Sequence, residues 1–205
     1  MSCYNGPACK ICRRNRVKLY LKGERCFTAK CAIEKRNFPP GIRTVVLKKS
    51  TEYGRRLREK QKLRFFYGLT DKSIKVYFQK ALKKKGVAGY NLLVFLESRL
   101  DNVIYRCQIG RSRAEARQVV RHGHVYVNSQ KVDIPSYSLR VGDEFFVKSA
   151  FAESIRKEIE KNEVRKMPSW ISYDQEKQIF KIMGLPKREE IDTPVEERLV
   201  VELLR

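Results

Sequence analysis

The amino-acid sequence predicts an α+β protein: a mostly helical first domain with an N-terminal metal knuckle, and an inserted small module of two helices on a sheet. Three observations lead to this fold class. Four cysteines gather between residues 9 and 31, apolar residues recur at helical spacing from residue 52 to residue 120, and apolar and polar residues alternate from residue 125 onward.

The composition favours a polyanionic partner. The chain has 205 residues, with 45 Lys and Arg against 23 Asp and Glu, and a formal net charge of +22. Such an excess destabilises a compact chain by self-repulsion unless an anion neutralises it. Because the excess is spread along the chain, it predicts a protein that lies against nucleic acid over much of its surface. The alternative is a basic protein without such a partner.

The sequence contains no recognisable membrane or secretion segment. No apolar run approaches the roughly 18 residues of a membrane span, and the stretch MSCYNGPACKICRR lacks the apolar region of a signal peptide. We therefore expect a reducing, cytoplasmic compartment, where clustered cysteines are metal ligands more often than disulfides.

The N-terminal cysteines have the spacing of a metal site. Cys9 and Cys12 form a Cys-x2-Cys pair, and Cys26 and Cys31 form a second pair after a loop of thirteen residues. Four sulfurs arranged in this way suit one tetrahedral Zn²⁺ ion with no open position for catalysis. An iron–sulfur cluster is the first alternative, and disulfides or free thiols are the others. A segment of about 40 residues buries too little surface to fold alone, so a metal would stabilise it.

Basic residues surround the cysteines. Their positive charge favours ionised thiolates, and a folded knuckle would present the same side chains to phosphate groups. The candidate RNA-binding residues in this segment are Arg13, Arg14, Lys18 and Lys22.

Two helices are expected after an irregular linker that begins near Pro39-Pro40-Gly41. The first spans about Glu52 to Tyr67 and ends at Gly68, and the second covers SIKVYFQKALKKKG at residues 73–86. The first is strongly basic, and its candidate RNA-binding residues are Arg55, Arg56, Arg58, Lys60, Lys62 and Arg64.

A further pair of helices is predicted between residues 90 and 123. Residues 90–110 have the pattern of one helix, with Arg99 and Arg106 on one side and Cys107 as a small core residue. Ser112 and Glu115 have capping-box spacing and begin the second helix, which ends at His122-Gly123.

This second helix has three arginines at intervals of four residues. Arg113, Arg117 and Arg121 therefore form one stripe, which suits successive phosphates near a helix N-terminus. The alternative is a solvated helix face without a ligand. Nearby candidate RNA contacts are His122, His124 and Lys131, since the two histidines lack a third ligand for zinc.

Strands follow. Val125 and Val127 alternate with polar neighbours, Asn128-Ser129 forms a tight turn, and residues 145–147 form a later strand. Residues 151–166 have the charge pattern of a solvated helix, whereas the C-terminal pattern predicts no single element.

The expected domains are a zinc knuckle and linker at 1–45, a helical domain at 46–92 completed by 179–205, and the small module with its following helix at 93–178.

Taken together, these motifs resemble the bacterial small-subunit ribosomal protein S4 family, in its cysteine-containing form. The resemblance rests on the cysteine-rich N-terminus, LREKQKLR at 57–64, LESRLDNVIYR at 96–106, SRAEARQVVRHGHVYVN at 112–128 and IPSY at 134–137, and it covers nearly the full length.

The resemblance implies a function as well as a fold. It implies that the inserted module is of the RNA-binding alpha-L type, and that the protein is a primary binder of small-subunit ribosomal RNA at a junction in the 5′ domain. It further implies an early role in subunit assembly, contacts with messenger RNA at the entry path and with ribosomal protein S5, and an influence on decoding accuracy. An organellar ribosome is the alternative to a cytoplasmic one.

Three positions depart from the family pattern. Gln108 and Ser129 stand where the family usually has glycine, and Ile42-Arg43-Thr44 replaces the usual Gln, His and Gly. We therefore expect the loop at Gln108 to take a different path, and the departures at residues 42–44 weaken the case for carrying over the family's RNA contacts to the connector at residues 42–50.

Two other classes of protein share some of these features. RNA-modifying enzymes append a similar module, but this chain has no room for a catalytic domain and no catalytic or phosphate-binding motif. A zinc-containing regulator would share the charge and the cysteines, but it would read base edges in duplex DNA. The sequence thus predicts a structural RNA-binding protein that is not an enzyme.

Overall fold

The computed structural model describes residues 4, 6–41, 51–148 and 167–205. Contacts divide the chain into two compact units, one made of Met1–Leu93 with Asp192–Arg205 and the other of Val94–Ile191. The expected helix at 151–166 and the departures at Ile42-Arg43-Thr44 lie outside the described residues.

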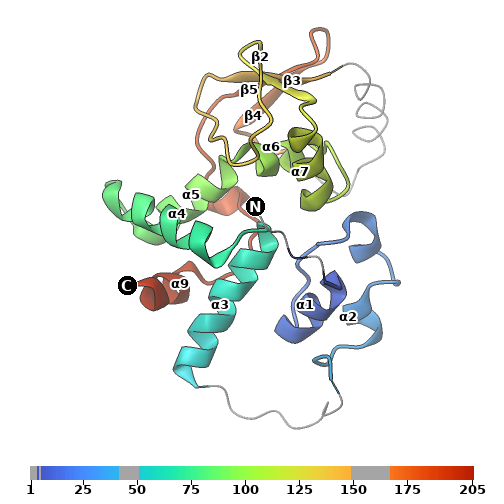
Figure 1. The fold of residues 1–205 in the computed structure, drawn as a ribbon, viewed down its shortest axis with the longest axis vertical. Coiled ribbons are helices and arrows are strands. Elements are labelled where there is room, and N and C mark those ends of the chain that lie inside the picture. Colours follow the sequence, from blue (N-terminus) through green and yellow to red (C-terminus); the bar gives the residue numbers. More distant parts are fainter. Residues whose placement is uncertain (1–3, 5, 42–50, 149–166) are drawn as a thin grey trace. The chain divides into compact units, whose positions relative to one another are not determined.

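The first unit is helical. In chain order (Figure 1) it contains α1 (Ala8–Asn15), the 3-10 turn η1 (Gly23–Cys26), α2 (Ala32–Lys35), α3 (Glu52–Phe66), α4 (Asp71–Lys83), most of α5 (Ala88–Glu97) and α9 (Glu197–Leu204). The helices expected at 52–67 and 73–86 are therefore confirmed as α3 and α4.

Both ends of α3 are fixed by local hydrogen bonds. The Thr51 hydroxyl accepts a hydrogen bond from the Gly54 amide at 3.2 Å and caps the N-terminus. At the other end, Gly68 has a φ of +63°, and the Leu69 amide donates to the Arg64 carbonyl at 2.8 Å. This arrangement is the Schellman motif, and it explains why the helix ends where the sequence predicted.

The C-terminal helix α9 packs against α3 and α4 (Figure 1). Tyr67 and Thr193 share a buried hydrogen bond of 2.8 Å between their hydroxyls, and the Glu196 amide donates to the Glu59 carboxylate at 3.2 Å. Residues 192–205 thus close the helical unit, although about 100 residues of chain lie between them and its other helices.

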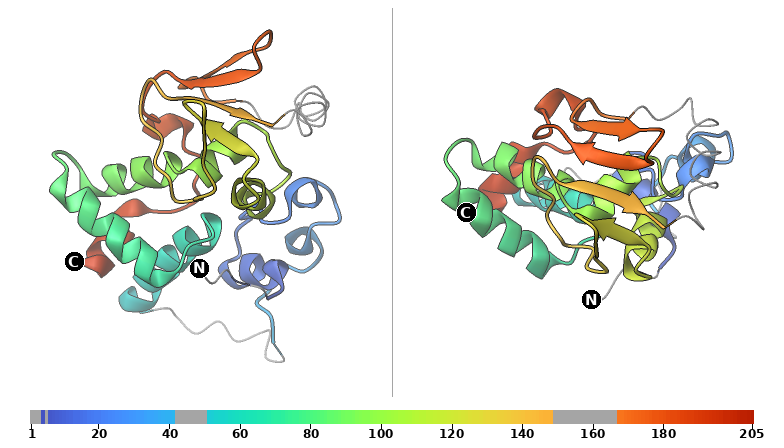
Figure 2. Two further views of the ribbon diagram at one scale, coloured as in Figure 1. Left: turned by 45° about the horizontal axis from the view of Figure 1, so that its top comes forward. Right: turned by 90° about the horizontal axis from the view of Figure 1, so that it is seen from above.

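The second unit packs two helices on one antiparallel sheet. After the end of α5 come α6 (Leu100–Arg106), α7 (Arg113–Arg121) and the strands β1 (Val125–Val127), β2 (Gln130–Lys131), β3 (Glu144–Val147), β4 (Ile171–Asp174) and β5 (Ile179–Ile182); the short η2 (Arg188–Glu190) follows. The strand order is β2-β1-β3-β5-β4. Figure 2 shows these strands and the helices in two further views.

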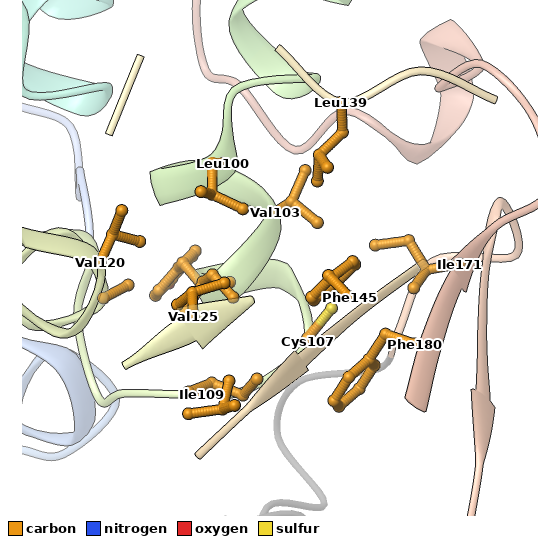
Figure 3. Close-up of a cluster of buried hydrophobic side chains, with 14 of the residues drawn as sticks. Leu100, Val103, Cys107, Ile109, Val120, Val125, Leu139, Phe145, Ile171 and Phe180 are labelled. Carbon is orange, nitrogen blue, oxygen red and sulfur yellow. The ribbon is translucent and has the colours of Figure 1, made fainter. Parts of the chain in front are cut away.

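Apolar residues from both helices and from one face of the sheet form the core of this unit (Figure 3). Leu100 and Val103 of α6 and Val120 of α7 meet Phe145 and Phe180 of the strands there. Cys107 is fully buried in the same cluster, as the sequence predicted. The core thus determines which sheet face is covered and which is left for other contacts.

One predicted helix is two helices. The sequence predicted a single helix over residues 90–110, but α5 ends at Glu97 and α6 begins at Leu100. Between them Arg99 has extended backbone and bridges Ser138, while the Leu100 amide donates to the Tyr137 carbonyl and the Leu139 amide to the Ser98 carbonyl. These long-range hydrogen bonds replace the helical ones, which local periodicity cannot reveal.

The hairpin of β4 and β5 was not predicted, and its turn contains neither Gly nor Pro. The domain boundary expected after residue 178 falls inside this hairpin, because β5 pairs with β3 as well as with β4. Of the expected helical segment 179–205, the structure assigns residues up to Ile191 to the second unit and only Asp192–Arg205 to the first.

Candidate nucleic-acid interface

The four N-terminal cysteines lie in one small segment. Cys9 and Cys12 are on α1, Cys26 ends η1 and Cys31 precedes α2, and all four are free thiols. The pKa of Cys12 is raised to about 11, mainly by burial, with smaller contributions from the neighbouring Cys26, Cys9 and Cys31. Mutual influence of this kind requires the sulfurs to be close together.

The cysteines do not form a closed metal site in this structure. Within the described parts of the chain, no three His, Cys, Asp or Glu side chains are grouped so as to hold a metal ion. The donor set has the chemistry that Zn²⁺ prefers, and the Lys22 amide already donates to Cys26 Sγ at 3.4 Å. The ligand set therefore fits zinc in chemistry and spacing, but the expected metal knuckle is not seen.

The cations of this segment differ in their surroundings. Arg13 lies over the Phe38 ring and donates to the Phe38 carbonyl at 3.0 Å, and Lys18 pairs with Glu34. Arg14 and Lys22 are exposed. Arg14 and Lys22 are therefore the predicted residues of this segment with side chains left for an external anion.

The basic residues of α3 also fall into two groups, those paired with acids and those left exposed. Lys60 and Arg64 both pair with Asp71 at 3.0 Å, Lys62 pairs with Glu59 at 2.6 Å, and Arg56 pairs with Glu52 and Glu202. Arg55 and Arg58 are exposed and have no acidic partner among the residues described. Most of the basic helix is thus neutralised by acids of its own unit.

In the second unit, arginines predicted to contact RNA form a buried ionic network. The Arg99 side chain is 3% exposed and donates to both oxygens of Asp101, at 3.0 and 2.6 Å. Arg106 makes the same kind of paired contact with Glu97, at 2.9 and 3.1 Å. Charges this deeply buried need such partners. Arg99 and Arg106 therefore act in the structure as internal ion-pair partners of α5 and α6.

The arginine stripe of α7 faces α6 over most of its length. Arg117 pairs with Asp101 at 2.8 Å, and Arg113 donates to Asn102 at 3.0 Å with its guanidinium 4.3 Å from the Tyr105 ring centre. Arg121, at the C-terminal end, is exposed. The spacing placed the three residues on one face, as predicted, but that face packs on a neighbouring helix.

The capping box at the start of α7 forms with a shifted partner. The Ser112 hydroxyl accepts from the Glu115 amide at 3.3 Å, while Glu115 accepts from the Arg111 amide at 2.7 Å. The Arg111 side chain also pairs with Glu115, at 3.6 Å, and is 61% exposed. The sequence analysis did not select Arg111, although it directly precedes the capping serine.

The exposed basic residues of this unit include several near the ends of α7 and along the sheet. His122 and Lys131 are exposed and His124 is half-buried. Exposed basic residues that were not predicted to contact RNA include Arg111, Arg140, Lys148 and Lys177. No periodic pattern distinguishes them, and only their exposure in the fold does.

None of the helices described here is long and apolar enough to cross a membrane.

Comparison with known proteins agrees with this architecture. Residues 3–97 match the family model described as the ribosomal protein S4/S9 N-terminal domain, and residues 98–145 match the S4 domain. The chain is 50% identical over 205 residues to small ribosomal subunit protein uS4 of Desulforamulus reducens, covering 99% of each chain. It is 51% identical to the uS4 protein of Acetivibrio thermocellus (99% of each) and 50% identical to that of Thermus thermophilus (98% of each).

Proposed function

Because this chain belongs to the uS4 family of small ribosomal subunit proteins, which are structural components and not enzymes, we propose that it is a primary binder of small-subunit ribosomal RNA. It binds a multi-helix junction in the 5′ domain, and it acts early in assembly of the small subunit. The observation that supports this most directly is the net charge of +22, which a folded polyanion would neutralise.

The structure favours a particular set of contacts. The exposed Arg14, Lys22, Arg55 and Arg58 of the first unit, and Arg121, His122 and Lys131 of the second, are the side chains available to phosphate. Arg99, Arg106, Arg113 and Arg117 hold α5, α6 and α7 together and so position the exposed residues. Phosphate contacts from a rigid surface recognise the shape of folded RNA.

Further roles are proposed from family membership. The protein contacts messenger RNA at the entry path and ribosomal protein S5, and through these contacts it influences decoding accuracy.

We also propose that Cys9, Cys12, Cys26 and Cys31 bind one Zn²⁺, with an iron–sulfur cluster as the alternative. Their spacing, shared segment and electrostatic coupling support the proposal. Since the sulfurs are not grouped for a metal in the structure, binding would draw them together and release their protons. Elemental analysis of purified protein should find about one zinc per chain, and Cys9→Ser should lower that content sharply. Wild-type protein with neither zinc nor iron would contradict the proposal.

A competition experiment tests the RNA-binding function. The full-length protein is offered three competing ligands at physiological salt: the 5′-domain fragment of small-subunit ribosomal RNA, bulk tRNA and duplex DNA. We expect clear preference for the ribosomal fragment, and equal binding to all three would contradict the proposal.

Salt dependence separates contacting from positioning arginines. Arg121→Ala should reduce the slope of log affinity against log salt by about one while leaving the unfolding midpoint unchanged. Arg117→Ala should instead lower the unfolding midpoint, because it removes a partner from buried Asp101. An unchanged slope in Arg121→Ala would show that this residue contacts no phosphate.

A further inference from the structure

The open face of the sheet contains a pair of stacked aromatic side chains. Tyr126 on β1 lies directly opposite Phe146 on β3, and their rings stack with centroids 5.1 Å apart and planes 4° from parallel. The flanking residues Val125, Val127 and Phe145 point into the core. By strand alternation, both rings lie on the opposite face, away from α6 and α7.

A hollow lies beside this pair. It has a volume of about 350 Å³, its lining includes Tyr126, Phe146 and Val147, and Lys148, Lys177 and Gln178 complete it. Lys177 and Gln178 come from the turn between β4 and β5, the hairpin that the sequence did not predict. The size is at the lower end for small-ligand sites, and is suited to one flat ring with its attached sugar.

Three lysines lie close to the rings. Lys148 and Lys177 border the hollow, and Lys131 on β2 lies directly opposite Tyr126. None of the three forms an ion pair with a described acidic residue. The acid nearest along β3, Glu144, is paired with Lys181 at 2.8 Å.

We propose that this face binds a single-stranded segment of RNA, with a base stacked on Phe146 or Tyr126 and its neighbouring phosphates contacted by Lys131, Lys148 and Lys177. Aromatic rings on a sheet bordered by cations suit unpaired bases, because a base in a duplex has no free face for stacking. An acidic peptide would use the lysines alone and leave the rings without a role. The inference rests on the proposed RNA-binding function and adds a contact on the side of the sheet opposite α7.

The test uses full-length protein and a single-stranded RNA octamer that contains 2-aminopurine, whose fluorescence falls on stacking. We expect quenching by the wild type, octamer affinity about tenfold weaker in Phe146→Leu, and near wild-type affinity in Phe146→Tyr. Tyr53→Leu is the matched control, because Tyr53 is 64% exposed on α3, and it should change nothing. An abasic octamer of equal charge and a polyglutamate peptide should both bind at least tenfold more weakly.

Three results would overturn the inference: no quenching by the wild type, unchanged octamer affinity in Phe146→Leu, or binding of the abasic strand or polyglutamate as tight as that of the octamer.

If Phe146→Leu does not fold, photo-crosslinking of the wild type to a 4-thiouridine octamer tests the site instead. Crosslinks at residues 125–127 or 145–148 would support the site, and crosslinks only elsewhere would overturn it. Wild-type binding to the 5′-domain fragment is measured in parallel, so that loss of the proposed function is distinguished from loss of this contact.

Discussion

Two single residues have left-handed backbone at positions where the resemblance implies glycine. Gln108 has a φ of +64° and Ser129 a φ of +67°. Side chains adopt this conformation at a cost of about 1–2 kcal/mol, which glycine avoids. With Asn128 at +47°, Ser129 forms the two-residue turn between β1 and β2.

The turn provides a prediction about stability. Ser129→Gly should raise the free energy of unfolding by about 1 kcal/mol, since Ser129 is exposed and loses little on removal of its side chain. Ser172→Gly, at an exposed position of β4, is the control and should lower it by about 0.5–1 kcal/mol. Urea unfolding measures both, and a loss of stability in Ser129→Gly would contradict the role assigned to the turn.

A buried thiol predicts a dependence on pH. Burial raises the pKa of Cys107 well above its usual range. The folded state therefore keeps its proton where the unfolded state, with a thiol pKa of about 8.5, loses it. This contribution to stability is complete below about pH 8.5 and is lost as pH rises further.

The fluorescence of Trp170, which lies in the same core, can follow this effect. Between pH 8 and 10 the unfolding midpoint of the wild type should fall more steeply than that of Cys107→Ala. Equal slopes would show that Cys107 does not contribute. Cys12 and Cys26, whose pKa values are also raised, are present in both proteins and cancel in the comparison.

Among the elements, α5, α6 and α7 are joined by charge as well as by apolar packing. Asp101 accepts from Arg99 and Arg117, and Glu97 accepts from Asn102 and Arg106. The cluster fixes the point where α5 ends and α6 begins, and it orients the face of α7. The same arginines that give the sequence an RNA-binding pattern are thus required to build the module.

Asp101 is the residue on which this cluster depends most. Asp101→Ala should lower the free energy of unfolding by about 3–5 kcal/mol, because it leaves the buried Arg99 guanidinium without its carboxylate. The exposed Asp133→Ala is the matched control and should change stability by no more than about 0.5 kcal/mol. Chemical denaturation of both variants measures the difference, and a mild effect at Asp101 would mean that water or other groups satisfy Arg99.

For the molecule as a whole, the chain path makes the helical unit depend on both ends of the sequence. Residues 192–205 return to the first unit, where α9 packs on α3 and Tyr67 bonds Thr193. The second unit has a separate core that includes Trp170, the one tryptophan in the chain.

Truncation after Ile191 should therefore affect the two units differently. The helical unit should lose stability, seen as lower helix content by circular dichroism and faster proteolysis within residues 52–83. The Trp170 fluorescence transition should stay within a few degrees of the wild type. Equal loss in both signals would show that the two units unfold as one.

Much of the fold follows from local pattern. The bounds of α3, the presence of α4, the capped start of α7, the Asn128-Ser129 turn and the inward-facing Val125 and Val127 were predictable, although α4 begins two residues and ends three residues earlier than predicted. In each case the signal lies within a few residues: a cap, a glycine, or a period of 3.6 or 2. The break at Arg99 and the β4–β5 hairpin were not predictable, because their hydrogen bonds join residues far apart or use an unremarkable turn.

The sequence by itself determined that the chain is a strongly basic member of a ribosomal protein family with clustered N-terminal cysteines, since charge, spacing and motif are properties of residue order. Only the tertiary structure decided which basic side chains remain for RNA. An arginine becomes an internal ion-pair partner where the fold brings an acid within a few ångströms, and otherwise it stays exposed to ligands. Asp101 lies that close to Arg99 and Arg117, but Arg121 has no such pairing within the described part of the chain. The interaction energy of an ion pair falls with the distance between the charges and with their exposure to water. Pairing therefore depends on the fold more than on the neighbouring sequence.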